Sequence, residues 1–389
     1  MRIAYVCADR GVPVFGTKGC SVHAQELIRA FRRRGHEVAL FAARLGGRPP
    51  ADLASMAVTE LPEFAAGRPA DLDSANQATV DRIGDEGGFD LVYERYSLWS
   101  HAGPSAAQRL ATRALLEVNA PLIDEERRYR GGADLEPARL IVRQALRESR
   151  AVVAVSRAVA DWVRTLAPSA IPVEVIPNGV DPRRFRGIDR SGERPGFTIG
   201  FVGTMKPWHG LTVLAEAFER LAPHHPEARL LLVGDGPERE PVSRAFERAG
   251  LADRVEWTGA VDPEMVPGLL ARMDVGVAPY PSGEDCYFSP LKVFEYLAAG
   301  LPVVASRVGQ LGDVLVHQRS ALLVAPGSAV ELADGLDLLA RDRSLRHRIA
   351  GAGRVLVESE FTWDRVAART IALATPWSLR RRAFLSAAY

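Results

Sequence analysis

Cysteine and long apolar runs are both scarce in this 389-residue sequence. Only three cysteines occur, at positions 7, 20 and 286, and their spacing matches no zinc motif. So few cysteines, in an odd number, argue against a disulfide framework and suit a reducing compartment. No window approaches the roughly 18 apolar residues of a membrane-spanning helix, and the apolar run at the N-terminus is too short for a signal peptide. We therefore expect a cytoplasmic protein.

Lysine is nearly absent as well. All but three of the 49 basic residues are arginine, and the three lysines are Lys18, Lys206 and Lys292. Basic and acidic residues nearly balance, with a formal net charge of +1. Such a balance creates no strong field that would favour nucleic acid or an acidic membrane. We expect no nucleic-acid partner.

The clearest motif among the residues that are present is the stretch 288–306, which predicts a loop, a helix and a buried strand. Ser289 and Pro290 are expected to open the helix as a hydroxyl cap followed by proline. A helix N-terminus offers free N–H groups and a partial positive charge, which suit a phosphate, and Lys292 adds a formal charge. Glu295 follows one turn later, where a carboxylate suits the vicinal hydroxyls of a ribose. An ordinary capped helix with Glu295 on its exposed face is the alternative.

Short apolar strands alternate with amphipathic helices along both halves of the sequence. The expected strands are 2–8, 37–41, 90–93, 114–118, 151–155, 197–202, 229–233, 255–259 and 275–280. This alternation predicts an α/β fold with doubly wound parallel sheets. The polar segment 186–196 separates the halves, so we expect domains at 1–180 and 181–361. A closing helix and tail are expected at 362–389.

Glycine-bearing loops follow the first strand of each half, at the end where open parallel sheets bind ligands. The loop 11–21 contains Gly16 and Gly19 but neither a Walker A sequence nor G-x-G-x-x-G. A plain surface loop is its alternative interpretation. On the helix that follows it, we interpret His23 and Glu26 as solvated or capping side chains. The charged segment 125–132 is expected to be a mobile loop.

Several of these motifs together resemble the retaining, nucleotide-sugar-dependent glycosyltransferases of family 4. The donor-binding signature of that family is matched at Pro290, Glu295, Ala298, Gly300, Pro302, Val303 and Val304, and the hinge pattern Pro-Asn-Gly-Val-Asp at 177–181. Tyr287 stands where the family has the first glutamate of its Glu-x7-Glu motif, and the nearby Glu284 and Asp285 are out of register. The resemblance implies a GT-B fold, in which two Rossmann-like domains face across a cleft and a C-terminal helix crosses back to the N-terminal domain.

The resemblance also assigns roles to residues. Lys206 and Lys292 would stabilise the departing diphosphate, and Asn119 stands where relatives commonly carry a histidine facing the reaction centre. The residues expected to bind the donor are Gly16, Gly19, Gly203, Thr204, His209, Gly234, Trp257, Thr258, Ser289, Pro290, Leu291 and Glu295. The implied reaction retains the anomeric configuration and uses neither a metal nor another cofactor.

Other aspects of the function stay open at this stage. UDP is the expected nucleotide, with GDP as the alternative, and the acceptor is an aminocyclitol, a saccharide or a lipid-linked molecule. A nucleotide-sugar epimerase, a phosphorylase or a non-catalytic nucleotide-sugar-binding protein would be compatible with the same frame. Arg95 and Tyr96, after the strand 90–93, would either contact an acceptor or have a structural role. The basic run 380–382 suggests at most a peripheral membrane contact, and we expect a monomer or homodimer.

Overall fold

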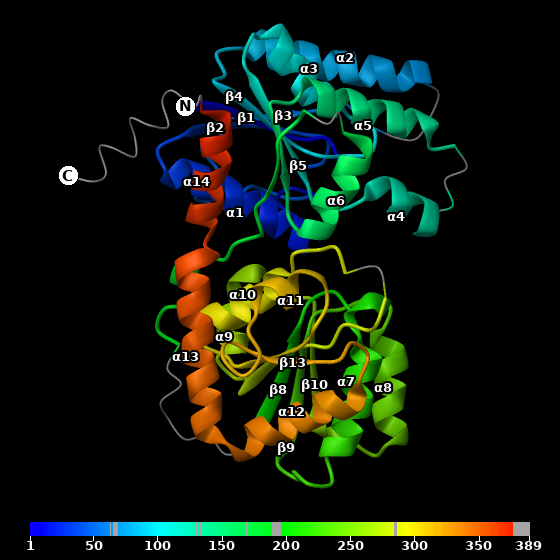
Figure 1. Ribbon diagram of the computed structural model, residues 1–389, viewed down its shortest axis with the longest axis vertical. Coiled ribbons are helices and arrows are strands. Elements are labelled where there is room, and N and C mark those ends of the chain that lie inside the picture. Colours follow the sequence, from blue (N-terminus) through cyan, green and yellow to red (C-terminus); the bar gives the residue numbers. More distant parts are fainter. Residues whose placement is uncertain are drawn as a thin grey trace, which may run out of the picture. The chain divides into compact units, whose positions relative to one another are not determined.

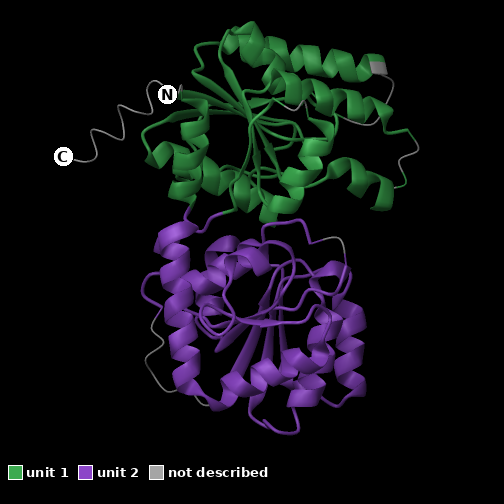
Figure 2. Cartoon of the chain, in the orientation of Figure 1, with its two compact units in different colours: residues 1–178, 363–389 green, residues 179–362 purple. Residues whose placement is uncertain are grey.

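The computed structural model describes residues 1–62, 64, 69–129, 131, 134–167, 170–188, 196–283 and 286–375. The chain forms two compact units (Figure 2). Unit 1 contains residues 1–178 and 363–389, and unit 2 contains residues 179–362. The basic run 380–382 and the offset acidic pair at 284 and 285 lie outside the described residues. No helix in the described ranges is long and apolar enough to cross a membrane.

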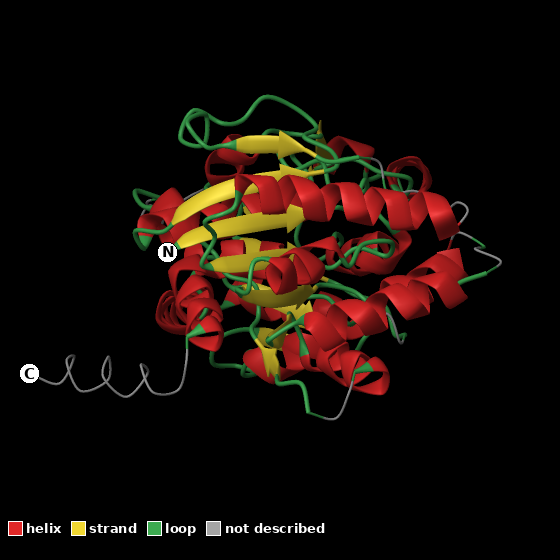
Figure 3. Cartoon of the chain, turned by 90° about the horizontal axis from the view of Figure 1, so that it is seen from above, coloured by secondary structure: helices red, strands yellow, loops and turns green. Residues whose placement is uncertain are grey.

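Unit 1 is built on a parallel sheet of seven strands. They are β1 (Arg2–Cys7), β2 (Glu37–Ala42), β3 (Val58–Glu60), β4 (Leu91–Arg95), β5 (Arg113–Val118), β6 (Ala151–Ala154) and β7 (Val173–Val175). Their order in the sheet is β3-β2-β1-β4-β5-β6-β7. The central strands are buried almost throughout, as expected where helices cover both faces of a parallel sheet (Figure 3).

The helices of unit 1 include one that comes from the far end of the chain (Figure 1). They are α1 (Gly19–Arg33), α2 (Pro69–Glu86), α3 (Ala102–Arg109), α4 (Leu122–Tyr129), α5 (Glu136–Glu148), α6 (Arg157–Leu166) and α14 (Trp363–Ala374). Helix α14 packs against α1, and Arg33 forms an ion pair with Asp364 at 2.7 Å. The prediction of a C-terminal helix that returns to the first domain is confirmed. Residues 125–129 of the charged segment 125–132 belong to α4.

Unit 2 repeats the architecture with a six-stranded parallel sheet. Its strands are β8 (Phe197–Val202), β9 (Ala228–Val233), β10 (Val255–Gly259), β11 (Val275–Ala278), β12 (Val303–Ser306) and β13 (Leu322–Val324). Their order is β10-β9-β8-β11-β12-β13. The predicted fold class, two Rossmann-like parallel-sheet domains, is therefore confirmed. Each sheet reverses its strand order once, between β1 and β4 in unit 1 and between β8 and β11 in unit 2.

The helices of unit 2 include α10, which forms from the motif at 288–306 and lies beside β8. The α-helices are α7 (Leu211–Leu221), α8 (Arg239–Arg248), α9 (Val266–Leu270), α10 (Leu291–Ala298), α11 (Gly309–Val314), α12 (Ala329–Arg341) and α13 (Arg343–Glu360). Short 3-10 helices are η1 (Pro182–Phe185), η2 (Pro207–His209), η3 (Ala252–Arg254) and η4 (Pro263–Met265). The backbone N–H of Val202 donates to the hydroxyl of Tyr296 at 2.7 Å. This bond ties α10 to the carboxyl end of β8.

The start of α10 differs from the prediction by one residue. The helix begins at Leu291, and Pro290 occupies the N-cap position with no capping side chain. The prediction that Ser289 caps the helix is therefore wrong. Proline has no N–H and a restricted φ, so it suits this boundary without a hydroxyl cap. Ser289 and Pro290 are buried, and Leu291 is half-buried.

Candidate functional site

The reversal of strand order between β8 and β11 makes a crevice at the carboxyl ends of these two strands. Chain segments leave neighbouring strands toward opposite sides at such a point, so no connection covers the opening between them. Gly203 follows β8 directly, and Tyr280 lies two residues beyond β11. The loop 203–210 and the start of α10 thus lie near the carboxyl ends of these central strands.

The loop 203–210, after β8, and the loop 234–238, after β9, pack backbone against backbone. The N–H of Met205 donates to the carbonyl of Asp235 at 2.9 Å. A Cβ on Gly234 would lie only 2.1 Å from the carbonyl oxygen of Gly203. Both glycines have positive φ, 141° at Gly203 and 124° at Gly234, which other residues rarely adopt. Close packing of the two loops therefore accounts for glycine at both positions, whether or not they also bind the donor.

Lys292 places a buried ammonium beside this loop. Its Nζ lies 3.9 Å from the ring centroid of Phe201 and 3.0 Å from the position of a Cβ on Gly203. No hydrogen-bond partner for Nζ is present within the described part of the chain. Burial lowers the pKa of Lys292 to about 7, although Glu295 acts in the opposite direction. The lysine thus presents a poorly solvated cation that an anion would stabilise.

His209 is neutral and has a defined tautomer. Its Nδ1 forms a hydrogen bond with the carbonyl of Thr204. Because a carbonyl only accepts, Nδ1 must carry the proton, and Nε2 is left as an acceptor. Burial lowers the pKa of His209 to about 3, and the positive charges of Lys292 and Lys206 contribute. His209 can therefore accept a hydrogen bond from a hydroxyl but supplies no charge for a phosphate.

Lys206, in the same loop, has its Nζ 5.8 Å from the centroid of the Trp208 ring.

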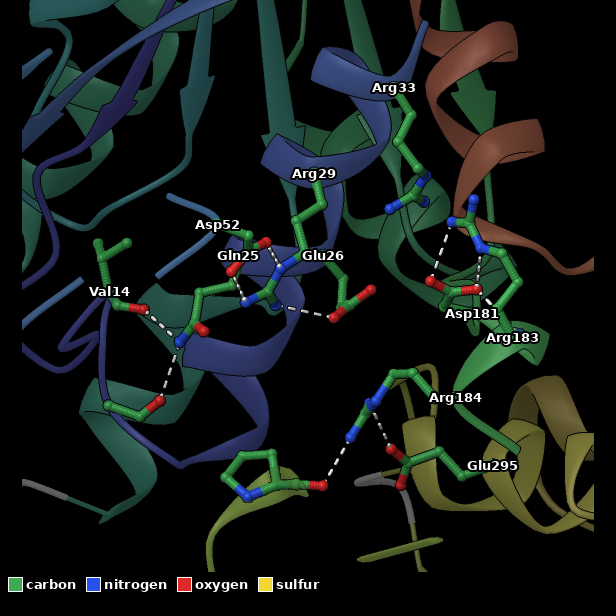
Figure 4. Close-up of polar contacts among 12 residues, drawn as sticks. Val14, Gln25, Glu26, Arg29, Arg33, Asp52, Asp181, Arg183, Arg184 and Glu295 are labelled. Carbon is green, nitrogen blue, oxygen red and sulfur yellow. Dashed lines mark hydrogen bonds and ion pairs between the residues drawn. The ribbon is translucent and has the colours of Figure 1, made fainter. Parts of the chain in front are cut away.

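Glu295 is held by an arginine that the sequence analysis did not single out. Arg184, in η1, donates from Nη1 to Glu295 Oε1 at 3.5 Å and from Nη2 to the carbonyl of Pro263 at 2.6 Å (Figure 4). The Glu295 side chain is 16 % exposed, so a ligand can reach it. The only sequence signal for Arg184 is its place three residues after the hinge pattern at 177–181.

Two further predicted donor residues of unit 2, Trp257 and Thr258, lie on the edge strand β10. The Trp257 ring packs against Phe246 with a centroid distance of 6.5 Å, and the Arg239 guanidinium lies 5.7 Å from its centroid. The Thr258 hydroxyl donates to the carbonyl of Gly259 at 2.8 Å. Both side chains thus have contacts within unit 2 that account for their positions without a ligand.

In unit 1, a glutamine holds the glycine loop that follows β1. Gln25 Nε2 donates to the carbonyls of Val14, at 2.8 Å, and Gly16, at 3.0 Å (Figure 4). Gly19 is the first residue of α1. The loop therefore has a defined conformation that depends on a side chain two turns into the helix.

A buried polar cluster lies beneath the carboxyl ends of β4 and β5. His23 Nε2 lies 2.8 Å from Glu117 Oε1, and Arg95 Nη1 lies 3.7 Å from Glu117 Oε2. Burial acts to raise the pKa of Glu117, but His23 and Arg95 outweigh it and lower the pKa to about 2. The Trp363 ring of α14 packs edge-on against His23 at 5.0 Å.

Two predictions on α1 are wrong. His23 and Glu26, expected to be solvated or capping, are both buried, and Glu26 accepts a hydrogen bond from Arg29 at 2.9 Å.

Asn119 lies one residue past β5, and its buried Nδ2 has no hydrogen-bond partner within the described residues.

Comparison with known proteins matches both halves of the chain to glycosyltransferase models. Residues 17–184 match the model "Glycosyltransferase Family 4", and residues 196–342 match "Glycosyl transferases group 1". The two matches together account for most of the chain and agree with the two-domain fold. The protein therefore belongs to the family 4, group 1 glycosyltransferases.

Individual relatives differ in donor and acceptor. One is a GDP-mannose-dependent alpha-(1-6)-phosphatidylinositol monomannoside mannosyltransferase of Mycobacterium tuberculosis, 30 % identical over 51 % of this chain and 55 % of that protein. Another is a 2-deoxystreptamine glucosyltransferase of Streptomyces kanamyceticus, 32 % identical over 49 % of this chain and 50 % of that protein. The matched region thus spans about half the length of these relatives.

The fold agrees with that of a solved structure. HepE of Anabaena, crystallised with UDP and glucose, superposes with a TM-score of 0.72 at 19 % identity. The superposition covers 96 % of this chain and 98 % of that one. At this identity the likeness supports the GT-B architecture alone.

Proposed function

We propose that the protein transfers a sugar from a UDP-sugar to a hydroxyl of an acceptor, with retention at the anomeric carbon. The observation that carries the proposal is the buried Lys292 ammonium beside Gly203 and the start of α10. A diphosphate there would supply the counter-charge that Lys292 lacks. The N–H groups of the first turn of α10 have no partner within the helix and would donate to the distal phosphate.

The other residues take the roles that follow from their positions. Glu295, held by Arg184, would accept hydrogen bonds from the ribose hydroxyls. Lys206 would add a second cation for the leaving diphosphate, and His209 Nε2 would accept from a donor-sugar hydroxyl. Charge stabilisation of the leaving group in a poorly solvated site can supply a large part of the rate enhancement. Unit 2 would thus bind the donor and unit 1 the acceptor, and Asn119 of unit 1 would form a hydrogen bond with the acceptor.

Donor departure in this proposal needs neither a metal nor another cofactor, because Lys292, Lys206 and the helix N–H groups supply the electrophilic groups. The leaving phosphate itself would take the proton of the attacking hydroxyl. UDP is preferred over GDP because of the resemblance at the donor signature. The GDP-mannose-dependent relative keeps GDP as the alternative to be tested.

The donor site is tested by calorimetric titration with UDP and GDP, with and without EDTA. We expect UDP to bind the wild type, EDTA to leave the affinity unchanged, and Glu295→Ala to weaken binding about tenfold or more. That loss corresponds to removing a hydrogen bond to a charged group. Glu240→Ala, an exposed carboxylate on α8, is the matched control and should bind as the wild type does.

Two outcomes would contradict this part of the proposal. If neither nucleotide binds, the transferase interpretation fails. If binding is lost on addition of EDTA, the metal-free site is wrong. With a UDP-sugar and an acceptor, NMR of the new linkage reports the anomeric configuration. A product that is an epimer of the donor sugar would instead indicate an epimerase.

Arg184 provides a separate prediction. Arg184→Ala should weaken UDP binding about three- to tenfold, because the Glu295 carboxylate loses the partner that orients it before the ribose arrives. Arg183→Ala, a change at the exposed neighbour that pairs with Asp181, is the control. Titration of both variants with UDP measures the effect. Tighter binding by Arg184→Ala would show that the ion pair competes with the ribose rather than orienting Glu295.

A further inference from the structure

A series of aromatic rings leads away from Lys292 in unit 2. The Lys292 Nζ lies 3.9 Å from the ring centroid of Phe201 and 5.8 Å from that of Tyr280. The ring centroid of Tyr280 lies 5.0 Å from that of Phe288, and the ring of Phe288 lies 6.0 Å from that of Tyr287. These separations are typical of aromatic rings that pack together. The series therefore begins at the proposed diphosphate site and continues along the segment that follows β11.

The neutral His209 packs against the same series. Its ring centroid lies 6.0 Å from that of Tyr280 and 6.1 Å from that of Trp208, which is 37 % exposed. The carbonyl of Thr204 holds Nδ1, so Nε2 is left as a neutral hydrogen-bond acceptor. The rings and this imidazole thus offer a ligand apolar surface and little charge.

Two glycines hold the ends of the segment that carries these rings. A Cβ on Gly210 would lie 1.7 Å from the carbonyl oxygen of Pro279. A Cβ on Gly309 would lie 2.0 Å from the carbonyl oxygen of Cys286. Both glycines have positive φ, 69° and 42°. Because the backbone packs this tightly at both ends, the rings are positioned before a ligand arrives, which lowers the cost of binding.

The sugar of a bound nucleotide-sugar would lie along this series. A diphosphate at Lys292 carries the sugar on its distal phosphate, so C1 of the sugar stays close to the ammonium. The opposite edge of the sugar, with its C6 substituent, then reaches toward Phe288 and Tyr287, which are both half-buried. Burial of a methyl group against such rings is favourable. Burial of a hydroxyl there costs free energy unless it finds a hydrogen-bond partner.

We propose that the donor carries a 6-deoxy sugar, whose C6 methyl group packs against the rings of Tyr287 and Phe288. A hydroxymethyl group at C6 would lose its water against the same rings, and a carboxylate would lose more. The inference rests on the proposed transferase function and narrows the donor to one chemical class.

The test compares three UDP-sugars that differ only in the substituent at C6. UDP-6-deoxyglucose has a methyl group, UDP-glucose a hydroxymethyl group and UDP-glucuronic acid a carboxylate. In calorimetric titrations, the wild type should bind UDP-6-deoxyglucose about five- to tenfold more tightly than UDP-glucose, because the apolar surface discriminates against one hydroxyl. UDP-glucuronic acid should bind more weakly than either. Tyr287→Phe should keep this order, whereas Tyr287→Glu should abolish the preference for the methyl group, because a carboxylate can accept a hydrogen bond from the hydroxymethyl group.

Tyr129→Glu is the matched control, since it makes the same change at an exposed tyrosine on α4 and should leave all three affinities unchanged. Equal or tighter binding of UDP-glucose or UDP-glucuronic acid by the wild type would overturn the inference. A loss of the preference in Tyr287→Phe would also overturn it, because the hydroxyl and not the ring would then select the sugar.

Titration of the same samples with UDP alone reports separately on the donor site. Unchanged UDP affinity in Tyr287→Glu would show that the variant is folded and that its nucleotide site is intact. If UDP binds but the three UDP-sugars bind equally, the inference about the sugar fails and the transferase proposal stands. If UDP does not bind the wild type, the transferase proposal itself fails.

Discussion

Replacement of Lys292 by methionine is expected to lower kcat for sugar transfer by about 10²- to 10³-fold, the effect of removing one preorganised charge-stabilising group. The same change should leave the fold intact or more stable. The Lys292 ammonium is buried without a hydrogen-bond partner in the described residues, and methionine has a similar volume without the charge. Opposite effects on activity and stability would distinguish a functional lysine from a structural one.

The stability difference between wild type and Lys292→Met should also depend on pH. The native pKa of Lys292 is about 7, against 10.5 for an ordinary lysine. Between these values the unfolded chain binds the proton and the native protein does not, so the wild type gains stability as pH rises through this window. The variant lacks the group. Its advantage in unfolding free energy should therefore be largest near pH 7 and shrink toward pH 10.

Steady-state assays and denaturant unfolding at pH 7 and 10 measure both effects. Arg220→Met is the control, since it removes one exposed cation from α7 and should change neither quantity appreciably. A Lys292→Met enzyme with kcat within about threefold of wild type would exclude a role in stabilising the departing diphosphate.

Glu117→Gln should give the largest loss of stability. The carboxylate is 2 % exposed and is the counter-charge for the buried Arg95, as well as the partner of His23. Removal of one member of a buried ion pair costs about 3–5 kcal/mol, because the other charge stays buried and uncompensated. For a unit of this size we expect the melting temperature of unit 1 to fall by about 10 °C.

The control for this prediction is an exposed ion pair in the same unit. Glu174 lies 2.8 Å from Arg369, and both side chains are 47 % exposed. Glu174→Gln should therefore cost no more than about 1 kcal/mol. Because the native pKa of Glu117 is about 2, its contribution should be lost as pH falls from about 4.5 toward 2. Calorimetric scans of wild type and both variants measure these effects. Equal melting temperatures for the two variants would show that the buried pair adds no stability.

Local sequence pattern predicted most of the fold. Short apolar runs marked the strands, and the second half of the donor signature placed α10 and β12 to within a residue. These features depend on neighbours along the chain, which the sequence contains directly. The errors were also local. The charged segment 125–132 was expected to be mobile, and its residues 125–129 form part of helix α4. Ser289 was expected at the N-cap position of α10, which Pro290 occupies.

The site was less predictable because its contacts are remote in sequence. Arg184 and Glu295 are separated by 111 positions, and His23 and Glu117 by 94. Nothing in the sequence around His23 indicates burial, because Trp363 of α14, from the far end of the chain, covers it. Tyr96 was open between an acceptor contact and a structural role. Only the tertiary structure shows that its side chain is buried and that its hydroxyl has no hydrogen-bond partner within the described residues.

The sequence by itself thus determined the family, the alternation of strands and helices, and the glycines and lysines of the donor motif. These follow from composition, periodicity and the short spacing of motif residues. The tertiary structure decided which charges are buried, which are paired and which lack a partner. Burial and pairing depend on elements that pack together from distant parts of the chain, and these two properties set the pKa of Lys292 and of Glu117.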